Sequence, residues 1–248
     1  MIEKIHIFRK GFNFSQDGPG NRLVYHLSGC NLKCPWCSNP EGLKTTTNDT
    51  IPLTIEDIVN EAISCKMMYI DGGGVTLTGG EVTCQKESVV KLLRLLKENN
   101  INTCIETNAA LKDCEEIFET VDYMIADFKS PAADILKKVT KADLSIIKNN
   151  LLYRAKTGKP LLVRIPLINN FNTGEENAEL FCDFFEELQK ESGNTNLYFE
   201  ILTYHEYGKN KYEKLGIPYT VTEGFVSLES EKLLARSIKK KNLKLINT

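Results

Sequence analysis

The sequence lacks the features that mark a membrane-bound or exported protein. None of its apolar runs approaches the about 20 residues that a membrane-spanning helix needs. The first residues, MIEKIHIFRKGF, are charged and contain no long apolar core of the kind found in signal peptides. We therefore expect a cytoplasmic protein without membrane contacts.

An excess of charge of one sign is also missing. The 31 Lys and Arg residues nearly balance the 33 Asp and Glu residues, which leaves a formal net charge of −2. A chain so close to neutrality has no general attraction for nucleic acid, so we expect no such partner. The short basic run at 239–241 is interpreted as the solvated end of a helix.

Metal-ligating residues are scarce outside one cluster. The chain has only 3 histidines, and five of its 8 cysteines are scattered singly through apolar patterns. A cytoplasmic chain of 248 residues does not need disulfides for stability. We expect buried free thiols at these five positions, which are Cys65, Cys84, Cys104, Cys114 and Cys182.

The other three cysteines lie together in SGCNLKCPWCSNPEG (28–42), with no fourth cysteine nearby. Cys30, Cys34 and Cys37 have the spacing C-x3-C-x2-C. A structural zinc site needs four ligands; His26 could in principle be the fourth, but strand periodicity does not fix the direction of its side chain. A cubane iron–sulfur cluster takes one thiolate per iron, so three cysteines would leave one iron open to a small molecule. The spacing therefore indicates a cluster used for chemistry.

Short apolar runs alternate with helical patterns along the chain. Runs bounded by Gly, Asn or Pro predict strands at 23–28, 75–79, 103–107, 123–129, 161–168 and 197–202. Apolar residues at helical spacing predict helices at 55–63, 89–96, 178–188 and 230–240, and Thr54 with Asp57 forms a capping-box-like start for the first. This alternation favours an α/β protein with a parallel sheet, either open and doubly wound or an incomplete barrel.

Unusual residues lie at or just past the ends of the predicted strands, and Arg164 lies inside the fifth. In parallel α/β proteins, chemistry gathers at the carboxyl ends of the strands, so we expect these residues at one mouth. They are Cys30, Gly79, Gly80, Glu81, Glu106, Thr107, Asn108, Asp127, Lys129, Arg164 and His205. For Arg164, a contact with an anionic ligand and a structural role inside a strand both remain open.

The cysteine motif, with Trp36 before its last cysteine, resembles the signature of the radical S-adenosylmethionine enzymes. Six further motifs resemble the glycyl radical enzyme activating enzymes over nearly the whole chain, above all those that activate pyruvate formate-lyase. They are DGPGNR (17–22), GGGVTLTGGE (72–81), ETN (106–108), ADFK (126–129), VRIPLI (163–168) and ILTYHEYGKNKYEKLG (201–216). The interval 38–79 contains only Cys65, so the chain resembles a short form without a ferredoxin-like insertion.

The resemblance implies one radical S-adenosylmethionine domain over residues 1–248, folded as a partial TIM-like barrel of about (β/α)6 with parallel strands and outer helices. It implies an anaerobic oxidoreductase with a [4Fe-4S] cluster on Cys30, Cys34 and Cys37. With S-adenosylmethionine, such an enzyme generates a 5′-deoxyadenosyl radical. The radical abstracts hydrogen from a glycine of a partner glycyl radical enzyme of the pyruvate formate-lyase type. Flavodoxin or ferredoxin would supply the electron.

The resemblance also implies roles for individual residues. Those that would bind S-adenosylmethionine are Trp36, Ser38, Gly79, Gly80, Glu81, Asp127, Lys129 and His205. Those that would hold a monovalent cation through oxygen atoms are Glu106, Thr107 and Asp127. Those that would form a turn at the mouth and receive the glycine loop of the partner are Asp17, Gly18, Pro19 and Gly20.

Three places depart from the family pattern. Val82-Thr83-Cys84 replaces a Pro-containing continuation, Ala109 stands where glycine is common, and Asn169-Asn170 replaces Pro-Gly. They bear on the identity of the partner rather than on the radical chemistry. Two alternatives stay open: a radical enzyme for a small metabolite, and a non-catalytic zinc or scaffold protein on a degenerate barrel.

Overall fold

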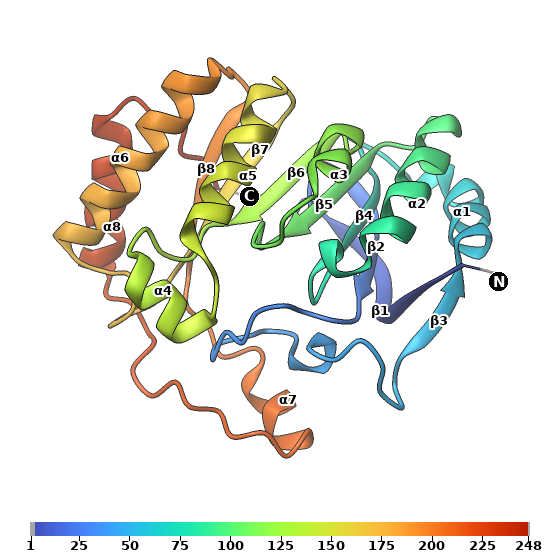
Figure 1. Cartoon of the computed structure of the whole chain (residues 1–248), viewed down its shortest axis with the longest axis horizontal. Coiled ribbons are helices and arrows are strands. Elements are labelled where there is room, and N and C mark those ends of the chain that lie inside the picture. The colour runs from blue at the N-terminus through green and yellow to red at the C-terminus, as the bar shows by residue number, and fades with distance from the viewer. Residues whose placement is uncertain (1–2, 248) are drawn as a thin grey trace. The chain divides into compact units, whose positions relative to one another are not determined.

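The computed structural model describes residues 3–247, which divide into two compact units (Figure 1). The first contains the described residues up to Asn31, with Asn39–Thr107 and Asp113–Ile125. The second contains Leu32–Ser38, Asn108–Lys112 and the described residues from Ala126 onward. The cysteine motif is therefore divided between the units, with Cys30 in the first and the other two cysteines in the second.

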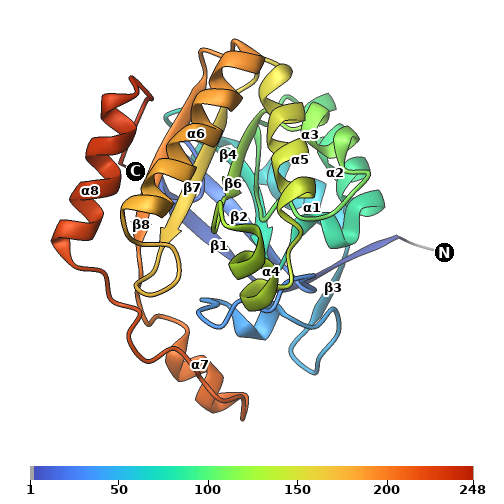
Figure 2. The same ribbon diagram turned by 60° about the vertical axis from the view of Figure 1, so that its left-hand side comes forward.

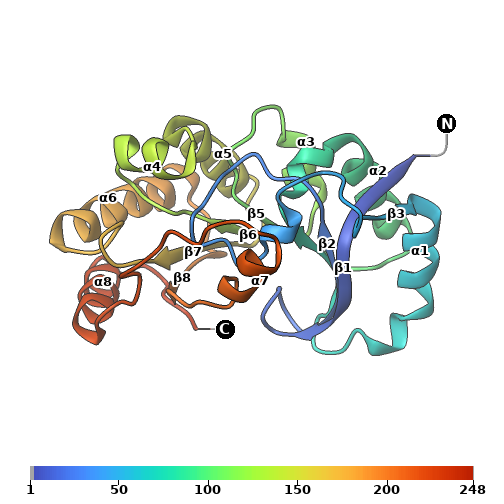
Figure 3. The ribbon, with the colours of Figure 1, turned by 90° about the horizontal axis from the view of Figure 1, so that it is seen from below.

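The first unit is built on five strands in the order β3-β1-β2-β4-β5. They are β1 (Lys4–Phe14), β2 (Asn21–Leu27), β3 (Ile51–Thr54), β4 (Gly74–Gly79) and β5 (Thr103–Thr107). The strands β2, β4 and β5 are parallel, whereas β1 runs antiparallel to both of its neighbours. In Figure 3, β1 runs past β3, which pairs only with residues 4–7.

Helices cover this sheet on its outer side. They are α1 (Ile55–Ser64), α2 (Lys86–Glu98) and α3 (Glu115–Thr120). The unit also contains the short helices η1 (Pro40–Gly42), η2 (Lys66–Met68) and η3 (Val82–Gln85). The α-helices pack side by side, α2 between the other two (Figure 1). The capping box at the start of α1 is confirmed, because Thr54 and Asp57 exchange the two expected hydrogen bonds.

The second unit contains the parallel strands β7 (Leu161–Leu167) and β8 (Leu197–Thr203). Its helices are α4 (Ala133–Thr140), α5 (Leu144–Lys156), α6 (Glu175–Ser192), α7 (Lys209–Lys214) and α8 (Leu228–Lys240). Helix α6 packs between α5 and α8 (Figure 2). Its Phe181 and Phe185 lie against Phe128 and Phe199, and these buried rings form much of the core of this unit.

The predicted α/β class, with parallel strands and outer helices, is confirmed. All six predicted strands are present, the fourth as β6 (Tyr123–Asp127), which begins in the first unit and ends in the second. Strands β1 and β3 and helices α3, α4, α5 and α7 were not predicted. The single domain over residues 1–248 stays a prediction. Among the described residues, no helix has both the length and the apolar character needed to cross a membrane.

Candidate functional site

The carboxyl ends of β2 and β4 are held together by backbone contacts. Gly80 donates its N–H to the Leu27 carbonyl at 2.8 Å, and Glu81 donates to the Gly29 carbonyl at 2.7 Å. A Cβ on Gly80 would lie 2.3 Å from the Gly29 carbonyl oxygen, closer than real Cβ contacts come. Gly79 has a φ of +117°, which favours glycine. These glycines are therefore required by neighbouring backbone, and contact with a ligand stays a prediction.

The side chain of Glu81 is buried in a hydrogen-bonded network. Its Oε1 accepts from the Thr83 N–H at 3.0 Å and the Thr83 hydroxyl at 2.7 Å. The same oxygen accepts from the Thr107 hydroxyl at 2.6 Å. Glu81 is only 1% exposed, so its carboxylate is fixed between the ends of β4 and β5. Thr83 belongs to the segment 82–84, which departs from the family pattern. Its two hydrogen bonds anchor the Glu81 carboxylate, a role that the sequence did not indicate.

The three predicted cation ligands each have a protein partner. Glu106 accepts from the Thr78 hydroxyl at 2.6 Å, and Thr107 donates to Glu81. Asp127 forms an ion pair with Lys129 in the second unit. Within residues 3–247, no group of three or more His, Cys, Asp and Glu side chains is arranged to hold a single metal ion. The cation site stays a prediction.

The turn Asp17–Gly20 lies at the amino end of β2. Arg22, which is fully buried, donates to the Pro19 carbonyl at 3.0 Å and to the Thr76 hydroxyl at 2.6 Å. At about 3.3 Å per residue, the seven residues of β2 separate this turn from Cys30 by roughly 20 Å. Its predicted place at the mouth is wrong, because the turn precedes β2 whereas Cys30 follows it. Receipt of a glycine loop by this turn stays a prediction.

In the second unit, residues Leu32–Ser38 form the cysteine loop. The Cys37 N–H donates to the Cys34 carbonyl at 3.2 Å, which closes a tight turn around both cysteines. Burial raises the pKa of the Cys34 thiol to about 11, and the ammonium of Lys129 offsets part of that rise. Iron is bound by thiolate, so loading of metal at Cys34 would release a proton.

Trp36 and Ser38 are each held by residues from distant parts of the chain. The Trp36 ring lies 4.6 Å from the Phe171 ring, centroid to centroid. The Ser38 carbonyl accepts a hydrogen bond of 2.8 Å from the ammonium of Lys211. The indole therefore rests on an aromatic neighbour, and the backbone after Cys37 is anchored.

Lys129 and Asp127 form a pair at the end of β6, with 2.8 Å between Nζ and Oδ2. The side chain of Lys129 is 10% exposed, whereas that of Asp127 is 39% exposed. Asn172 donates to the Lys129 carbonyl at 2.7 Å and so fixes the backbone there. The pair carries one buried positive group and one accessible carboxylate, which suits a polar or zwitterionic ligand.

His205 follows β8 and stacks on Tyr207, with 3.9 Å between ring centroids. The Tyr207 N–H donates to His205 Nδ1 at 3.3 Å, so the neutral ring carries its proton on Nε2. Desolvation lowers the pKa of His205 below its ordinary value, which favours that neutral form. His205 thus offers one N–H donor of fixed direction.

Arg164 is a structural residue inside the second unit. Its Nε lies 2.7 Å from Glu200 Oε2, and the side chains are 9% and 3% exposed. Arg164 and Glu200 are also directly paired in the register of β7 and β8. Of the two roles left open by the sequence, the strand-buried one is therefore confirmed.

The remaining departures and thiols have simple structural accounts. Ala109 and Asn170 adopt positive φ values of 52° and 60°, which glycine at those places would adopt without strain. The prediction of buried thiols is confirmed for three of the five cysteines. It is wrong for Cys84, which is exposed, and for Cys65, which is half-buried. Both sit at the end or start of a short helix, where one face meets solvent.

No disulfide joins any of the cysteines among the described residues, and the three of the motif are half-buried. By their donor chemistry, three thiols suit an iron–sulfur cluster, and their joint arrangement around such a cluster stays a prediction. The structure also identifies residues that the sequence did not single out: Arg22, Thr83, Phe171, Glu200, Lys211 and Tyr207. Their roles depend on contacts across the fold, although Arg22, Thr83, Tyr207 and Lys211 lie in segments that the sequence comparison with the family had already highlighted.

Residues 24–182 match the family model of the Radical SAM superfamily. This match covers more than half of the chain, so the chain belongs to the radical S-adenosylmethionine superfamily. The pyruvate formate-lyase-activating enzyme of Streptococcus mutans is 31% identical over 213 residues, which cover 83% of this chain and 79% of that enzyme. Within the superfamily, the chain therefore belongs to the pyruvate formate-lyase-activating enzymes. The predicted family, and with it the expectation of an enzyme, is confirmed.

Solved structures show the same fold. A domain of pyruvate-formate lyase-activating enzyme from Bacteroides vulgatus gives a TM-score of 0.56 at 22% identity, covering 71% of this chain and 98% of that chain. SuiB of Streptococcus suis, crystallised with S-adenosylmethionine, gives 0.62 at 19% identity, covering 90% of this chain and 48% of that chain. At these identities the likeness concerns the fold alone.

Proposed function

We propose that this chain installs a glycyl radical on a partner glycyl radical enzyme of the pyruvate formate-lyase type. The observation that carries the proposal is the 31% identity to an enzyme named for this activation, which extends over 83% of the chain. Pyruvate formate-lyase is the partner in the names of these relatives, and a partner of this type is part of the proposal for this chain.

Cys30, Cys34 and Cys37 would hold a [4Fe-4S] cluster, and S-adenosylmethionine would bind beside it. Together these groups supply one-electron cleavage that yields the 5′-deoxyadenosyl radical. Trp36 and Ser38 would contact the adenine. The fixed backbone at Gly79, Gly80 and Glu81 would meet the methionine amino group.

The charged groups of the second unit would orient the rest of the molecule. Lys129 would neutralise the methionyl carboxylate, and the accessible carboxylate of Asp127 would accept hydrogen bonds from ribose hydroxyls. The Nε2–H of His205 would donate to the nucleoside. Glu106, Thr107 and Asp127 would hold a monovalent cation, and Asp17, Gly18, Pro19 and Gly20 would contact the partner. Positioning and exclusion of water are the contributions of the protein.

We further propose a reducing, anaerobic and cytoplasmic setting with flavodoxin or ferredoxin as the electron donor. Cysteines that form no disulfide among the described residues suit a reducing compartment, and a cluster with an open iron is sensitive to oxygen. The electron donor is proposed only because the cluster needs a low-potential one-electron reductant.

The test uses anaerobically reconstituted, reduced protein mixed with a pyruvate formate-lyase and S-adenosylmethionine. We expect 5′-deoxyadenosine and a protein-centred doublet in electron paramagnetic resonance. A protein that cleaves S-adenosylmethionine but radicalises no glycyl radical enzyme would support the small-metabolite alternative. A colourless protein that binds one zinc would instead support the scaffold alternative.

A further inference from the structure

Helix α7 and the residue before it contact the cysteine loop at three carbonyl groups. Lys211 Nζ donates to the Ser38 carbonyl at 2.8 Å, and the Tyr212 hydroxyl donates to the Cys34 carbonyl at 3.3 Å. Gly208 packs against the Cys37 carbonyl so closely that a Cβ would lie 2.2 Å from its oxygen. These contacts join segments that are 173 and 178 positions apart, so tertiary structure alone brings them together.

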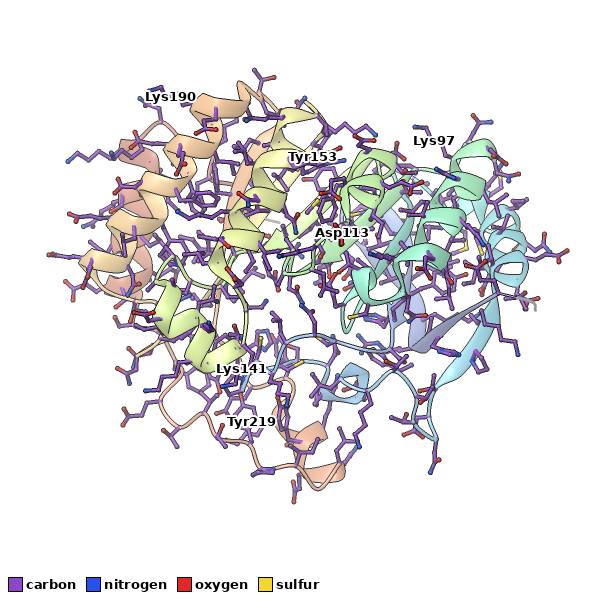
Figure 4. The ribbon with its side chains drawn as sticks, viewed as in Figure 1. Lys97, Asp113, Lys141, Tyr153, Lys190 and Tyr219 are labelled. Carbon is purple, nitrogen blue, oxygen red and sulfur yellow. The ribbon has the colours of Figure 1, made fainter. Side chains whose placement is uncertain are left out.

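The position of α7 is fixed by aromatic packing. Tyr212 is 5% exposed, and its ring meets that of Tyr219 edge-on at 5.0 Å. Tyr219 lies in the segment after α7 (Figure 4) and shares a hydrogen bond of 2.6 Å with the Tyr204 hydroxyl. The φ of Gly208 is −80°, which other residues also adopt, so glycine is needed here for close approach. A helix of six residues is thus held firmly enough to anchor the loop.

We propose that Lys211 and Tyr212 are positioning residues that fix the cysteine loop and thereby set S-adenosylmethionine affinity and the reduction potential of the cluster. The inference rests on the proposed function of that loop. The Lys211 ammonium is bound one residue after the last cysteine, and a positive charge there stabilises the reduced, more negative cluster. Its bond to Ser38 also orients the backbone assigned to the adenine.

The first experiment compares Lys211→Met with Lys214→Met, a change of the same kind at an exposed position of α7. Both proteins are reconstituted anaerobically without a partner enzyme. For Lys211→Met we expect S-adenosylmethionine binding weakened roughly tenfold, the usual effect of losing one charged hydrogen bond. We also expect a lower midpoint potential. Lys211→Arg, which keeps the charge and donor, restores most of both properties, and Lys214→Met matches the wild type.

The second experiment compares Tyr212→Phe with Tyr219→Phe. Each removes one hydroxyl from the same aromatic set, but only that of Tyr212 reaches the cysteine loop. We expect iron to leave Tyr212→Phe several-fold faster in the presence of a chelator, with a changed electron paramagnetic resonance spectrum of the reduced cluster. Tyr219→Phe retains the wild-type rate and spectrum.

The proposal is overturned if Lys211→Met and Tyr212→Phe both match their controls. Should one variant fail to fold, as judged by circular dichroism, the other pair decides. None of these measurements needs a partner enzyme. Failure of the wild-type protein to radicalise any partner would therefore refute the proposed function alone, while unchanged potentials and affinities would refute this inference alone.

Discussion

The two units present their candidate site residues in different ways. In the first unit, Gly79 and Gly80 are pressed against neighbouring backbone, and Glu81 is buried by hydroxyl donors. In the second unit, Asp127 keeps an accessible carboxylate, and His205 presents a ring of defined tautomer. The first unit thus supplies a rigid backbone frame, and the second supplies charged and aromatic side chains. Substitutions that add a side-chain atom should therefore destabilise the first unit, whereas substitutions of charged or aromatic residues should have their main effects in the second unit.

The largest effect is expected where the second unit buries a charge pair. Arg164→Met removes the guanidinium that pairs with the buried carboxylate of Glu200, which should destabilise the protein by about 3–5 kcal/mol. Urea unfolding measures the change. Lys156→Met is the control, because its pair with Glu191 spans 3.6 Å between exposed side chains and should cost at most about 1 kcal/mol.

The double variant Arg164→Met/Glu200→Met should recover most of the lost stability, because the buried carboxylate is removed together with the guanidinium. Equal losses of unfolding free energy in Arg164→Met and Lys156→Met would show that the Arg164–Glu200 pair contributes no more to stability than an exposed pair.

The second effect concerns the backbone frame of the first unit. Gly80→Ala places a Cβ 2.3 Å from one carbonyl oxygen and 2.5 Å from another, so we expect a loss of about 2–3 kcal/mol. Gly11→Ala in β1 is the control, because no atom lies within 4 Å of its Cβ and it should stabilise slightly. Denaturation midpoints compare the two. An unchanged denaturation midpoint for Gly80→Ala would mean that the neighbouring backbone shifts to accommodate the added Cβ.

The third effect concerns the stack of His205 on Tyr207. The folded-state pKa of His205 lies below its ordinary 6.5, so stability is lost as pH falls from that value toward the folded pKa. Tyr207→Ala should hydrate the His205 ring and raise the pKa of His205 toward 6.5. The pH range over which stability is lost then becomes narrower. Proton magnetic resonance follows the titration, and His205→Gln assigns the signal among the three histidines. An unchanged pKa would assign the desolvation to other neighbours.

The smallest effect is expected at Ala109. Ala109→Gly relieves strain at a φ of 52° but removes a buried methyl, so the net change should stay within about 0.5 kcal/mol. Ala110→Gly removes a buried methyl at ordinary φ and should cost about 1 kcal/mol. The difference between their unfolding free energies isolates the strain. Equal costs would show that Ala109 is unstrained.

Much of the fold could be predicted because the sheet strands are compact apolar runs, some with a glycine or asparagine at the boundary, such as Gly79 at the end of β4 and Asn108 after β5. β5 was predicted to the residue, whereas α5 was missed because it buries Asn150 and Arg154 where a helical pattern expects apolar residues. β1 was missed because alternation is limited to its buried Ile5 and Ile7 before the strand becomes exposed. Buried polar residues in a helix and exposed stretches of a strand both weaken the hydrophobic periodicity on which the prediction of secondary structure depends.

The residues at the strand ends were predictable, but their partners were not. Arg164 forms a hydrogen bond with Glu200, which lies 36 positions away in the sequence, and the Ser38 carbonyl accepts one from Lys211, which lies 173 positions away. No local pattern encodes such pairs, because they depend on which strands and loops the tertiary fold brings together. The position of the DGPG turn was predicted wrongly for a different reason. The turn precedes the predicted strand at 23–28 whereas Cys30 follows it, so the order in the sequence already places the two at opposite ends of that strand.

The burial of Arg22 has a consequence for the order of folding. Its guanidinium joins the start of β2 to Thr76 and Asn102, which are 54 and 80 positions further along the chain. Closing such long loops is slow, so the turn before β2 should order only after β4 and β5 have formed. In pulse-labelled hydrogen exchange, the Asn21 amide, bonded to the Ile70 carbonyl at 3.1 Å, should gain protection late. A nascent chain ending before residue 102 would therefore carry the DGPG motif without its final shape.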